Sequence, residues 1–467
     1  MKKIRDSVAR DQLMILPPSV EDYVSKDDSV RMINKILDDM NLDYLLSSCK
    51  GGGAPSYDPR ILMKVLIYGY SQGLVSSRKL DYILHNDVRY MYIAQMNRPD
   101  FRTICRFRRG LELEIKRVFT YIVRMCMECG LVLLEHVSLD GTKIEANVSG
   151  KNTFKKERLD NELECINKKI TSILEQAEKE DIEEDKLYGD TRGNELPQAL
   201  KNAENRKKLL EAAQKKLEES DRETICVTDP ESRVMKTRAG NRPAYNAQAV
   251  VDKEHQIIVA ADITQDESDN YQLPVMLEEL ESVTGKKPEC VTVDGGYNSK
   301  KALEYIEEND LNVYMPIYTN SAESKGFKYD ESSDEYICPF NMRLTFRSTR
   351  NKYDNTYRIY RHSCSDCPMR KVCCGDKNRV KEVWRRVNDE LQQKMLAKMQ
   401  TDTAKQAYRW RKQIVEPVHA DIKFNKGLWR FLLKGKDGAR IEYLLGCIGH
   451  NLRKIIRYAP KEVLGTV

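Results

Sequence analysis

The stretch that decides the fold is Val137-Ser138-Leu139-Asp140-Gly141-Thr142-Lys143-Ile144-Glu145-Ala146-Asn147. The largely apolar run from Leu131 to Leu139 predicts a buried strand that ends at Asp140 and then turns through Gly141. A carboxylate at the end of a buried strand is a natural partner for a metal ion or a base. Many strands end in aspartate only to begin a turn, so this stretch alone leaves both interpretations open.

The same design occurs a second time, in the stretch Cys290-Val291-Thr292-Val293-Asp294-Gly295-Gly296-Tyr297. Around it, apolar runs of strand length alternate with segments of helical periodicity. The order of hairpin, helix, strand, helix and strand is typical of a mixed sheet in an α/β fold. The predicted elements are strands 244–251 and 255–261, helix 271–283, the strand before Asp294, helix 299–309 and strand 312–317.

The length of 467 residues predicts two or three domains, and 40% hydrophobic residues are enough for a sizeable core. The net charge of +6, from 78 basic and 72 acidic residues, says little about partners. Its distribution says more, because thirteen Lys or Arg and four Asp or Glu lie between Lys405 and Arg457, an excess of nine. This excess suits a polyanion such as nucleic acid, although a solvated basic surface explains it equally well.

The sequence shows neither the apolar core of a signal peptide nor a run of about 20 apolar residues that could span a bilayer. We therefore expect a cytoplasmic, nucleoid-associated protein with no membrane partner. In that compartment, the thirteen cysteines are expected to be reduced thiols or metal ligands rather than disulfides.

Residues 1–130 are predicted to be all helical, with breaks at Pro17-Pro18 and at the glycine-rich loop 49–55. The predicted helices cover Ser29–Leu46, a segment that starts at Asp58-Pro59, Arg78–Leu84 with a cap from Ser76 or Ser77, and a segment from Pro99-Asp100 to Cys126. The last segment is strongly basic and contains Arg106 and Arg109. Short helices with tight turns indicate either a helix-turn-helix array that docks in a DNA groove or a plain helical bundle.

Residues 155–222 are rich in Lys, Glu, Leu and Ala, and their apolar residues recur at heptad spacing. Two such helices with a polar turn between them predict an antiparallel coiled-coil insertion without chemistry of its own. The first seam comprises Leu159, Leu163, Ile166, Ile170, Ile173 and Ala177, the turn contains Gly189, Gly193 and Pro197, and the second seam comprises Ala203, Leu210, Ala213 and Leu217.

Residues 331–385 are predicted to form a second, cysteine-containing insert with one CxxC motif and further cysteines at spacings compatible with a metal site. Zinc would bind four thiolates tetrahedrally, or His362 in place of one, and would stabilise a small insert with little core. Reduced structural cysteines explain a single CxxC motif at least as well. The candidate zinc ligands are Cys338, Cys364, Cys367 and Cys373.

The last informative stretch runs from Tyr408 to Lys423 and contains Val415-Glu416-Pro417. Glu416 and Lys423 are seven residues apart, so they share one helix face if the helix continues through Pro417. Pro417 could instead be the first residue of a new helix, where its missing N–H does no harm. The basic neighbours of Glu416 also fit an ordinary solvated helix with ion pairs. These neighbours are Arg411, Lys412, Lys423, Lys426 and Arg430, and an apolar packing helix is predicted from Glu442 to Arg453.

Two strand-end aspartates and a later glutamate suggest metal-assisted phosphodiester chemistry. Two divalent ions about 3.5–4 Å apart can activate an oxygen nucleophile and stabilise the leaving oxygen. Hard oxygen ligands suit Mg²⁺, or Mn²⁺ in its place, because water and the phosphate of the substrate complete the coordination. Asp140 could bridge the two ions, with Asp294 on one and Glu416 on the other.

In the order Asp140-Gly141-Thr142-Lys143, Asp294-Gly295-Gly296-Tyr297 and Val415-Glu416-Pro417, the chain resembles the DDE transposases of bacterial insertion sequences over nearly its whole length. The resemblance implies a ribonuclease-H-like catalytic domain over 131–154, 223–330 and 386–460, and a helical domain over 1–130 that binds DNA ends. It also implies recognition of terminal inverted repeats, strand cleavage, strand transfer into target DNA, and a homo-oligomer assembled on double-stranded DNA.

Many members of this family carry a Tyr-x2-Arg-x3-Glu-x6-Lys signature, and its second half matches Glu416 and Lys423. Tyr408-x2-Arg411 is followed by four residues instead of three, and a three-residue gap would place Lys412 in the position of the arginine. The resemblance implies that Tyr408 and Arg411 contact the DNA end and that Lys423 holds a phosphate near the cut. Further DNA contacts are expected from Lys426, Arg430, Arg106 and Arg109, and support or DNA positioning from Asn246, Gln248 and Tyr297.

Two other functions fit the same residues. A metal-dependent nuclease of this fold would cut DNA without joining it, and a regulator descended from a transposase would bind DNA without cutting it. All three carboxylates are present, which argues against a loss of catalysis.

Overall fold

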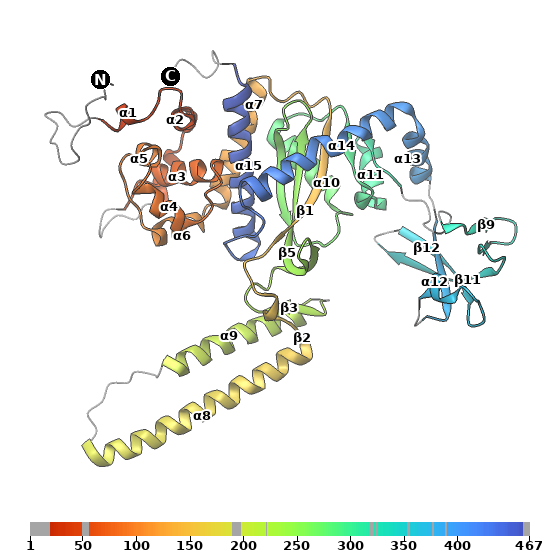
Figure 1. The fold of residues 1–467 in the computed structure, drawn as a ribbon, viewed down its shortest axis with the longest axis horizontal. Coiled ribbons are helices and arrows are strands. Elements are labelled where there is room, and N and C mark those ends of the chain that lie inside the picture. The colour runs from red at the N-terminus through yellow and green to blue at the C-terminus, as the bar shows by residue number, and fades with distance from the viewer. Residues whose placement is uncertain are drawn as a thin grey trace, which may run out of the picture.

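The structure is a computed structural model that describes residues 19–48, 56–188, 198–220, 222–317, 322, 325–352, 355–375, 378–387 and 390–460. Figure 1 shows a group of short helices beside a central sheet, a long helical hairpin that projects from the sheet, and a small second sheet. The predicted breaks at Pro17-Pro18 and 49–55, and the predicted turn with Gly189, Gly193 and Pro197, lie outside the described residues.

The chain before the central sheet forms helices that begin at aspartate caps. Side chains of Asp28, Asp58, Asp87 and Asp100 each accept a hydrogen bond from a backbone N–H in the first turn of a helix. Ser76 precedes its helix, but its side chain makes no capping hydrogen bond, contrary to the prediction. The helices are α1 (Val20–Tyr23), α2 (Ser29–Asp39), α3 (Pro59–Ser71), α4 (Ser77–Leu84), α5 (Val88–Ile93), α6 (Phe101–Arg108) and α7 (Glu112–Glu128), with a 3-10 helix at Asp43–Ser48.

Two of the predicted helices are wrong in extent. The first ends at Asp39, because Met40 takes an extended conformation before the 3-10 helix begins. The long basic helix is divided into α6 and α7, because the chain leaves the helix after Arg108 and Glu112 starts a new one with an acidic first turn, which a helix N-terminus favours. Arg108 itself is buried at this break.

The central sheet has the mixed topology that a ribonuclease-H-like domain requires. Strands β1 (Val137–Glu145) and β5 (Gly240–Asp252) pair antiparallel, whereas β7 (Val291–Val293) runs parallel to β1 and to β8 (Val313–Tyr314). On the other side of β5 lie β4 (Arg233–Thr237) and β6 (Ile258–Thr264), both antiparallel to it. The predicted hairpin is therefore confirmed as β5 and β6, and the α/β class is confirmed. Helices α10 (Gln272–Thr284) and α11 (Lys300–Glu308) complete the predicted order.

Strand β1 differs from its prediction in a way that matters for the site. It begins at Val137 and continues to Glu145, so Asp140 lies in the middle of the strand and not at its end. Gly141 makes no turn and continues the pairing with β5, opposite Gln248. The unbroken register with β5 overrides the local Asp-Gly turn signal, because each further residue of β1 finds a backbone partner.

Helix α14 (Asp402–Ala420) continues through Pro417, which decides between the two alternatives for this proline. A proline inside a helix leaves the carbonyl four residues earlier without its donor. Here the side chain of Gln256 supplies it, because Nε2 donates to the carbonyl oxygen of Gln413 at 3.0 Å. A π-helix, Asp421–Asn425, follows directly. Lys423 therefore lies in that segment, and the regular two-turn spacing from Glu416 does not apply.

The last helix, α15 (Gly435–Tyr458), joins the helical region to the sheet. It packs against α3 and α7 on one side and β6 on the other, within one continuous hydrophobic core. Glu442 of α15 is buried and lies 3.1 Å from Nη1 of Arg108, which also donates to the Tyr70 hydroxyl at 2.8 Å. Backbone N–H groups of Leu432 and Leu433 donate to the other carboxylate oxygen of Glu442. The predicted helix at this position is confirmed and longer.

Helices α8 (Lys156–Tyr188) and α9 (Gln198–Glu218) form the long hairpin of Figure 1. They pack on each other and meet the sheet through the short pair β2 (Thr153–Lys155) and β3 (Thr224–Cys226). Leu159, Leu210 and Leu217 are buried at the end near the sheet, in a core of their own. The two helices lie within residues 155–222, and a coiled-coil insertion with these bounds stays a prediction.

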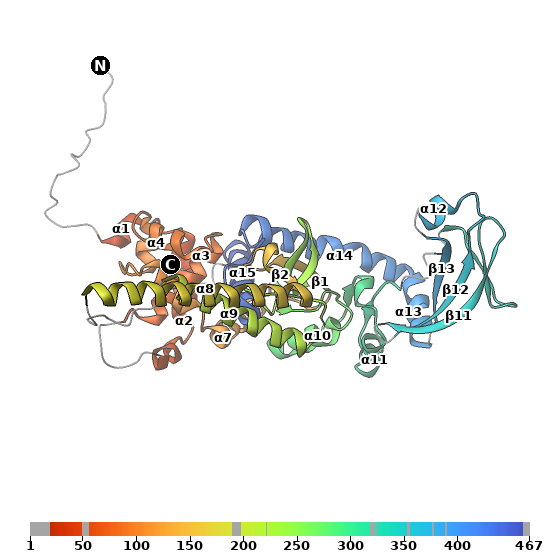
Figure 2. The same ribbon diagram turned by 90° about the horizontal axis from the view of Figure 1, so that it is seen from below.

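The second insert is a five-stranded antiparallel sheet with a small core of its own. Its strands are β9 (Lys328–Asp330), β10 (Glu335–Ile337), β11 (Arg343–Lys352), β12 (Asn355–Ser363) and β13 (Val380–Arg386), with the short helix α12 (Arg370–Cys374) before the last. In Figure 2 this sheet lies at the opposite end of the long axis from α1 to α4. Helix α13 (Glu390–Gln400) leads from it back to α14.

Within the described ranges, every helix is too short or too polar to cross a membrane.

The buried pair of Arg108 and Glu442 yields a stability prediction. Arg108→Met should lower stability by about 3–5 kcal/mol, because it leaves a buried carboxylate without its cation. The shift of the urea denaturation midpoint measures this loss. Lys116→Met is the matched control, since Lys116 pairs with Glu279 at 2.9 Å on the surface and such pairs contribute about 0–1 kcal/mol. Equal shifts for the two variants would contradict a structural role for the buried pair.

Candidate active site

Two of the three predicted acids lie side by side on the central strands. The parallel register pairs Ser138 with Thr292 and Leu139 with Val293, so Asp140 and Asp294 follow at the same level of neighbouring strands. Asp294 ends β7 as predicted, and its Oδ1 accepts a hydrogen bond from the N–H of Gly296 at 2.8 Å. The two carboxylates are close enough that each is part of the electrostatic environment of the other.

The surroundings of Asp140 change the pKa of its carboxyl. Burial raises the pKa of its carboxyl to about 6; Arg411 acts against this shift and Asp294 adds to it. Nη1 of Arg411 lies 3.7 Å from Oδ2 of Asp140, and Nε2 of His419 lies 4.0 Å from the same oxygen. Both partners come from α14, which packs across β1, β5 and β7. The acid is therefore held between the sheet and a positively charged helix face.

Glu416 is also on α14, but it lies outside this cluster. The face of α14 toward the sheet carries Arg411, Val415 and His419, which are buried, whereas Glu416 is exposed. Among all residues that the structure describes, no three His, Cys, Asp or Glu side chains are arranged to hold a metal ion. The structure brings two of the predicted acids together and leaves the third on the adjacent solvent face.

A hydrogen-bonded network backs the acids, and it includes an aspartate that the sequence prediction missed. Oδ1 of Asp269 accepts from Nδ2 of Asn246 at 2.6 Å and from Nε2 of Gln248 at 2.7 Å. Oε1 of Gln248 accepts in turn from the hydroxyl of Tyr297 at 2.5 Å. Lys143 lies 3.5 Å from the same Asp269 oxygen. Asn246, Gln248 and Tyr297 are thus brought together as expected, and Asp269 joins them.

Position 141 requires glycine because of this network and not because of a turn. A Cβ at position 141 would lie 2.6 Å from Oδ1 of Asp269 and 2.9 Å from Oδ1 of Asn246, and closer still to Gln248. No side chain fits there without displacing the polar groups, so the glycine next to Asp140 permits their close approach to β1. The signal for Asp269 in the sequence is weak, since it lies in a loop after β6 with other polar residues.

His419 is the second residue that the prediction missed. Burial lowers its pKa to about 4, and Lys423 adds to the shift, so the imidazole is neutral at pH 7. Neither ring nitrogen of His419 has a hydrogen-bond partner among the described residues, and the same holds for Nε and Nη1 of Arg411. Buried polar atoms without partners are costly and are expected to meet a ligand. Two of these atoms, Nη1 of Arg411 and Nε2 of His419, lie within 4.0 Å of Oδ2 of Asp140, so a polar group bound beside Asp140 could satisfy them.

Comparison with protein families decides the identity of the chain. The family described as Transposase DDE domain matches residues 337–456, which include α14 and most of α15. A second family, described as Transposase domain (DUF772), matches residues 18–110, which include the N-terminal helices. The chain belongs to the DDE transposases of insertion sequences. Its function therefore lies in transposition, although no individual curated protein matches it.

The remaining signature residues of the transposase lie at the rim of the site. Lys423 is half-buried, and burial followed by the charge of Lys143 lowers its pKa, whereas Asp140 acts in the opposite direction. The guanidinium of Arg411 lies 5.8 Å from the ring centroid of Tyr408. Tyr408 and Arg411 thus contact each other, but Arg411 is directed at Asp140 and is 7% exposed. Arg411 could therefore contact DNA only where a strand enters the site beside Asp140.

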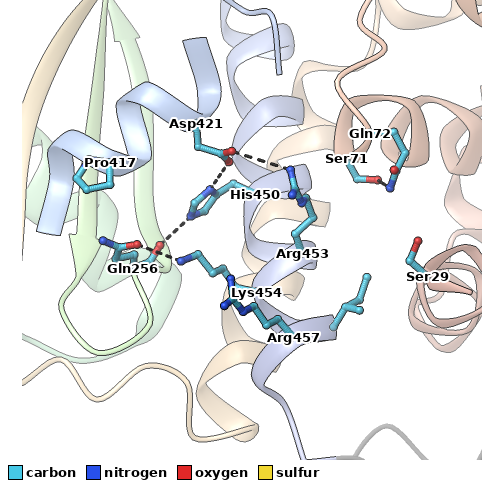
Figure 3. A pocket seen from close by; sticks show the side chains of 11 residues that line it. Ser29, Ser71, Gln72, Gln256, Pro417, Asp421, His450, Arg453, Lys454 and Arg457 are labelled. Carbon is cyan, nitrogen blue, oxygen red and sulfur yellow. Dashed lines mark hydrogen bonds and ion pairs between the residues drawn. The ribbon is translucent and has the colours of Figure 1, made fainter. Parts of the chain in front are cut away.

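Lys426 corrects the predicted set of DNA contacts. Its side chain is fully buried, donates to the carbonyl oxygen of Ser71 at 3.4 Å and lies 3.9 Å from Asp421. Asp421 also contacts Nδ1 of His450 at 2.8 Å, in a cavity of about 550 Å³ between α15 and the first helices (Figure 3). Lys426 is a structural cation inside the transposase and is not accessible to DNA, because the π-helix turns it inward.

The other predicted DNA contacts differ in accessibility. Arg430 is half-buried and donates to the carbonyl oxygens of Ala146 and Val148 at 3.2 and 2.9 Å, so it holds the chain that follows β1. Arg106 and Arg109 are exposed near the end of α6 and stay predicted DNA contacts.

The predicted zinc ligands line one cavity of about 310 Å³ in the second insert. Cys338, Cys364, Cys367 and Cys373 all contribute to it, together with His362, and all four cysteines are free thiols. Sγ of Cys338 accepts a hydrogen bond from the N–H of Met342 at 3.4 Å. The thiols share a cavity, but, as the side chains of the described residues lie, they do not form a finished tetrahedral site.

The raised pKa of Asp140 predicts a pH-dependent stability change in the transposase. The pKa of the Asp140 carboxyl in the folded chain, about 6, lies above its ordinary value of 3.8, so the ionised acid opposes folding increasingly as the pH rises from about 4 to 6. Without divalent ions, Asp140→Asn should raise stability by about 3 kcal/mol at pH 7.5 and by little at pH 4. Thermal unfolding in EDTA at both values measures this gain. Asp437→Asn, at an exposed aspartate, is the control, and a gain independent of pH would contradict the burial of a charge at Asp140.

Proposed function

We propose that the chain is an active transposase that binds the terminal inverted repeats of its element and catalyses metal-dependent strand cleavage and strand transfer. One observation carries this proposal, which is the pair of Asp140 and Asp294 on adjacent central strands under a basic face of α14. The family membership supports it, because transposition requires chemistry at a phosphodiester.

Two of the three predicted acids lie together at this site, and their chemistry suits a divalent cation. Asp140 and Asp294 are both acids, and the charge of Asp294 disfavours the ionised form of Asp140. A bound cation would relieve this repulsion. Asp140 and Asp294 would hold Mg²⁺ or Mn²⁺. Glu416 lies on the adjacent exposed face of α14, so it would have to turn toward the two aspartates to act as the third ligand. When bound, such ions activate the attacking oxygen and stabilise the leaving oxygen.

The protein's own groups bind and orient the DNA strand. Arg411 presents unpartnered N–H groups beside Asp140, and Lys423 adds a second cation at the rim, so both can bind phosphate oxygens. The network of Asn246, Gln248, Asp269 and Tyr297 holds β1, β5 and the turn after β7 at fixed distances, which keeps the two acids in register. Arg106 and Arg109 would contact phosphates along the duplex, and such binding weakens steeply with salt.

The domain division predicted from the sequence serves this function. The helices of residues 1–130 would bind the DNA ends, the central sheet with α14 and α15 would cut and join, and the two inserts at 155–222 and 331–385 would extend the contacts of a homo-oligomer on DNA. The nuclease and the regulator remain the alternatives, and one assay distinguishes all three. A nuclease yields nicks without joined products, and a regulator yields bound DNA without nicks.

The three acids should be individually essential for cleavage. Asp140→Ala, Asp294→Ala and Glu416→Ala are each expected to reduce nicking of DNA with the terminal repeats by about 10²-fold or more in Mg²⁺, with DNA binding retained. Gel assays of nicked and joined products measure the loss. Asp402→Ala is the matched control, since Asp402 is a fully exposed acid at the start of α14. Undiminished cleavage by any of the three variants would remove that residue from the site.

We also propose that the second insert binds one zinc ion through Cys338, Cys364, Cys367 and Cys373. The shared cavity and the small core support this, because a metal can stabilise a sheet that buries few apolar residues. Elemental analysis of the purified chain should find about one zinc per chain, and Cys367→Ser should lose it. Cys165→Ser, at an exposed cysteine on α8, is expected to keep it. Absence of zinc from the parent protein would contradict the proposal.

A further inference from the structure

The turn between β5 and β6 contains a residue with an unusual backbone conformation. Gln256 has a φ of 57°, in the left-handed region that residues other than glycine seldom adopt. Such a conformation persists where the surrounding contacts hold it, and it is a reason to ask what the residue does. The contacts that hold Gln256 come from two helices, α14 and α15.

Helix α15 fixes this turn to the core of the protein. Nδ2 of Asn451 donates to the carbonyl oxygen of Ile258 at 2.9 Å, and its Oδ1 accepts from the N–H of Ile258 at 2.9 Å. Nε2 of His450 lies 2.9 Å from the carbonyl oxygen of Gln256. Both His450 and Asn451 are buried. The backbone of Gln256 is therefore attached to a buried part of α15, and its side chain extends from a fixed point.

The charge of Lys454 determines how the amide of Gln256 is oriented. Nζ of Lys454 donates to Oε1 of Gln256 at 3.1 Å (Figure 3), and an ammonium group has no lone pair with which to accept. Nε2 is therefore the atom left for α14, and it donates to the carbonyl oxygen of Gln413 at 3.0 Å. This is the carbonyl that Pro417 leaves without its helical donor. One amide thus repairs α14 at its proline and connects it to α15.

Open space lies next to α14 at this connection. Gln256 lines two cavities, of about 550 Å³ and about 480 Å³. Pro417 lines the larger cavity and Gln413 lines the smaller one. Close packing would hold a helix in one position, but here the cavities leave room for the segment around Pro417 to shift. The hydrogen bond from Gln256 restricts that shift.

The restrained segment of α14 carries side chains that belong to the candidate active site. His419 lies two residues after Pro417, and its Nε2 is 4.0 Å from Oδ2 of Asp140. Glu416 directly precedes the proline. A misplacement of about 1 Å in an active site can cost about 10²-fold in rate. A restraint on this segment therefore acts on the position of both side chains relative to Asp140.

We propose that Gln256 is a positioning residue for the active site. Its amide compensates for Pro417 and holds the C-terminal part of α14 in the position relative to Asp140 that cleavage requires. In this role Gln256 acts through the carbonyl of Gln413 and not on the DNA. The role depends on Pro417, because any other residue at that position would supply the missing N–H itself. The inference rests on the proposed function, since it assigns a part in cleavage.

The test asks whether the effect of Gln256 depends on Pro417. Gln256→Glu keeps the size of the side chain and an oxygen for Lys454, but it replaces the N–H donor by a carboxylate oxygen. Cleavage of DNA with the terminal repeats by the full chain in Mg²⁺ is measured in single turnover. With Pro417 present, Gln256→Glu should lower the rate about fivefold, as expected for one lost hydrogen bond, and leave the Kd for DNA unchanged. In a Pro417→Ala background, the same change should alter the rate less than about twofold.

Hydrogen exchange of the backbone amides of α14 gives a second measurement that needs no catalysis. Without DNA, Gln256→Glu should speed the exchange of the amides around Pro417 about fivefold. In the Pro417→Ala background the exchange should stay the same with and without Gln256→Glu. Gln256→Gly removes the whole side chain but tolerates the left-handed backbone, so it should behave like Gln256→Glu in both measurements.

Gln265→Glu is the matched control. Nε2 of Gln265 also donates to a backbone carbonyl, that of Glu231 at 2.7 Å, but this bond makes no connection to α14. Any effect of Gln265→Glu on the cleavage rate or on hydrogen exchange should therefore be the same with Pro417 and in the Pro417→Ala background.

Three results would overturn the inference. The first is an equal effect of Gln256→Glu in both backgrounds, and the second is a weaker Kd for DNA with an unchanged cleavage rate. The third is faster cleavage by Gln256→Glu, because the bond would then hold α14 away from the acids. If the parent cleaves no DNA, the proposed function fails, whereas hydrogen exchange still decides whether Gln256 restrains α14. The two failures are thereby distinguished.

Discussion

The structure depends on one constraint, which is a carboxylate in the middle of a central strand. Asp140 is flanked by β5 and β7 and covered by α14, so its charge is removed from water on most sides. A buried charge needs compensation, and α14 supplies it with Arg411 while keeping His419 neutral. The glycine at 141 admits the polar network from the adjacent strand. Each unusual residue near the acid follows from the need to keep it ionisable inside a sheet.

Helix α15 makes the rest of the protein part of the same arrangement. Glu442 accepts from the loop before α15, contacts Arg108 at the end of α6 and lies 3.3 Å from the hydroxyl of Tyr70 on α3. The helical region and the sheet therefore share a core and a buried ion pair, instead of meeting across a solvated linker.

The sequence alone was sufficient for the order of the elements and for Asp294, because an apolar run followed by Asp-Gly-Gly is a local signal. It was insufficient for the position of Asp140 within its strand. The Asp-Gly turn signal was overridden by nine residue pairs between β1 and β5, and such pairing is a tertiary property. Asp269 and His419 were missed for a related reason, since their importance lies in tertiary contacts: Asp269 accepts from Asn246 and Gln248 on β5, and His419 lies beside Asp140 on β1. Lys426 was counted among the accessible bases because charge patterns do not reveal which side chains turn inward.

The junction of α14 and its π-helix shows how the two functions of this segment are combined. Pro417 removes one hydrogen bond of α14, and Gln256 replaces it from the sheet, which fixes the helix against β5 and β6. Four residues later, the wider π-turn changes the direction of the side chains, as such turns often do at functional sites. Within this segment Lys423 lies at the rim near Asp140, Phe424 is exposed, and Lys426 is buried in the core.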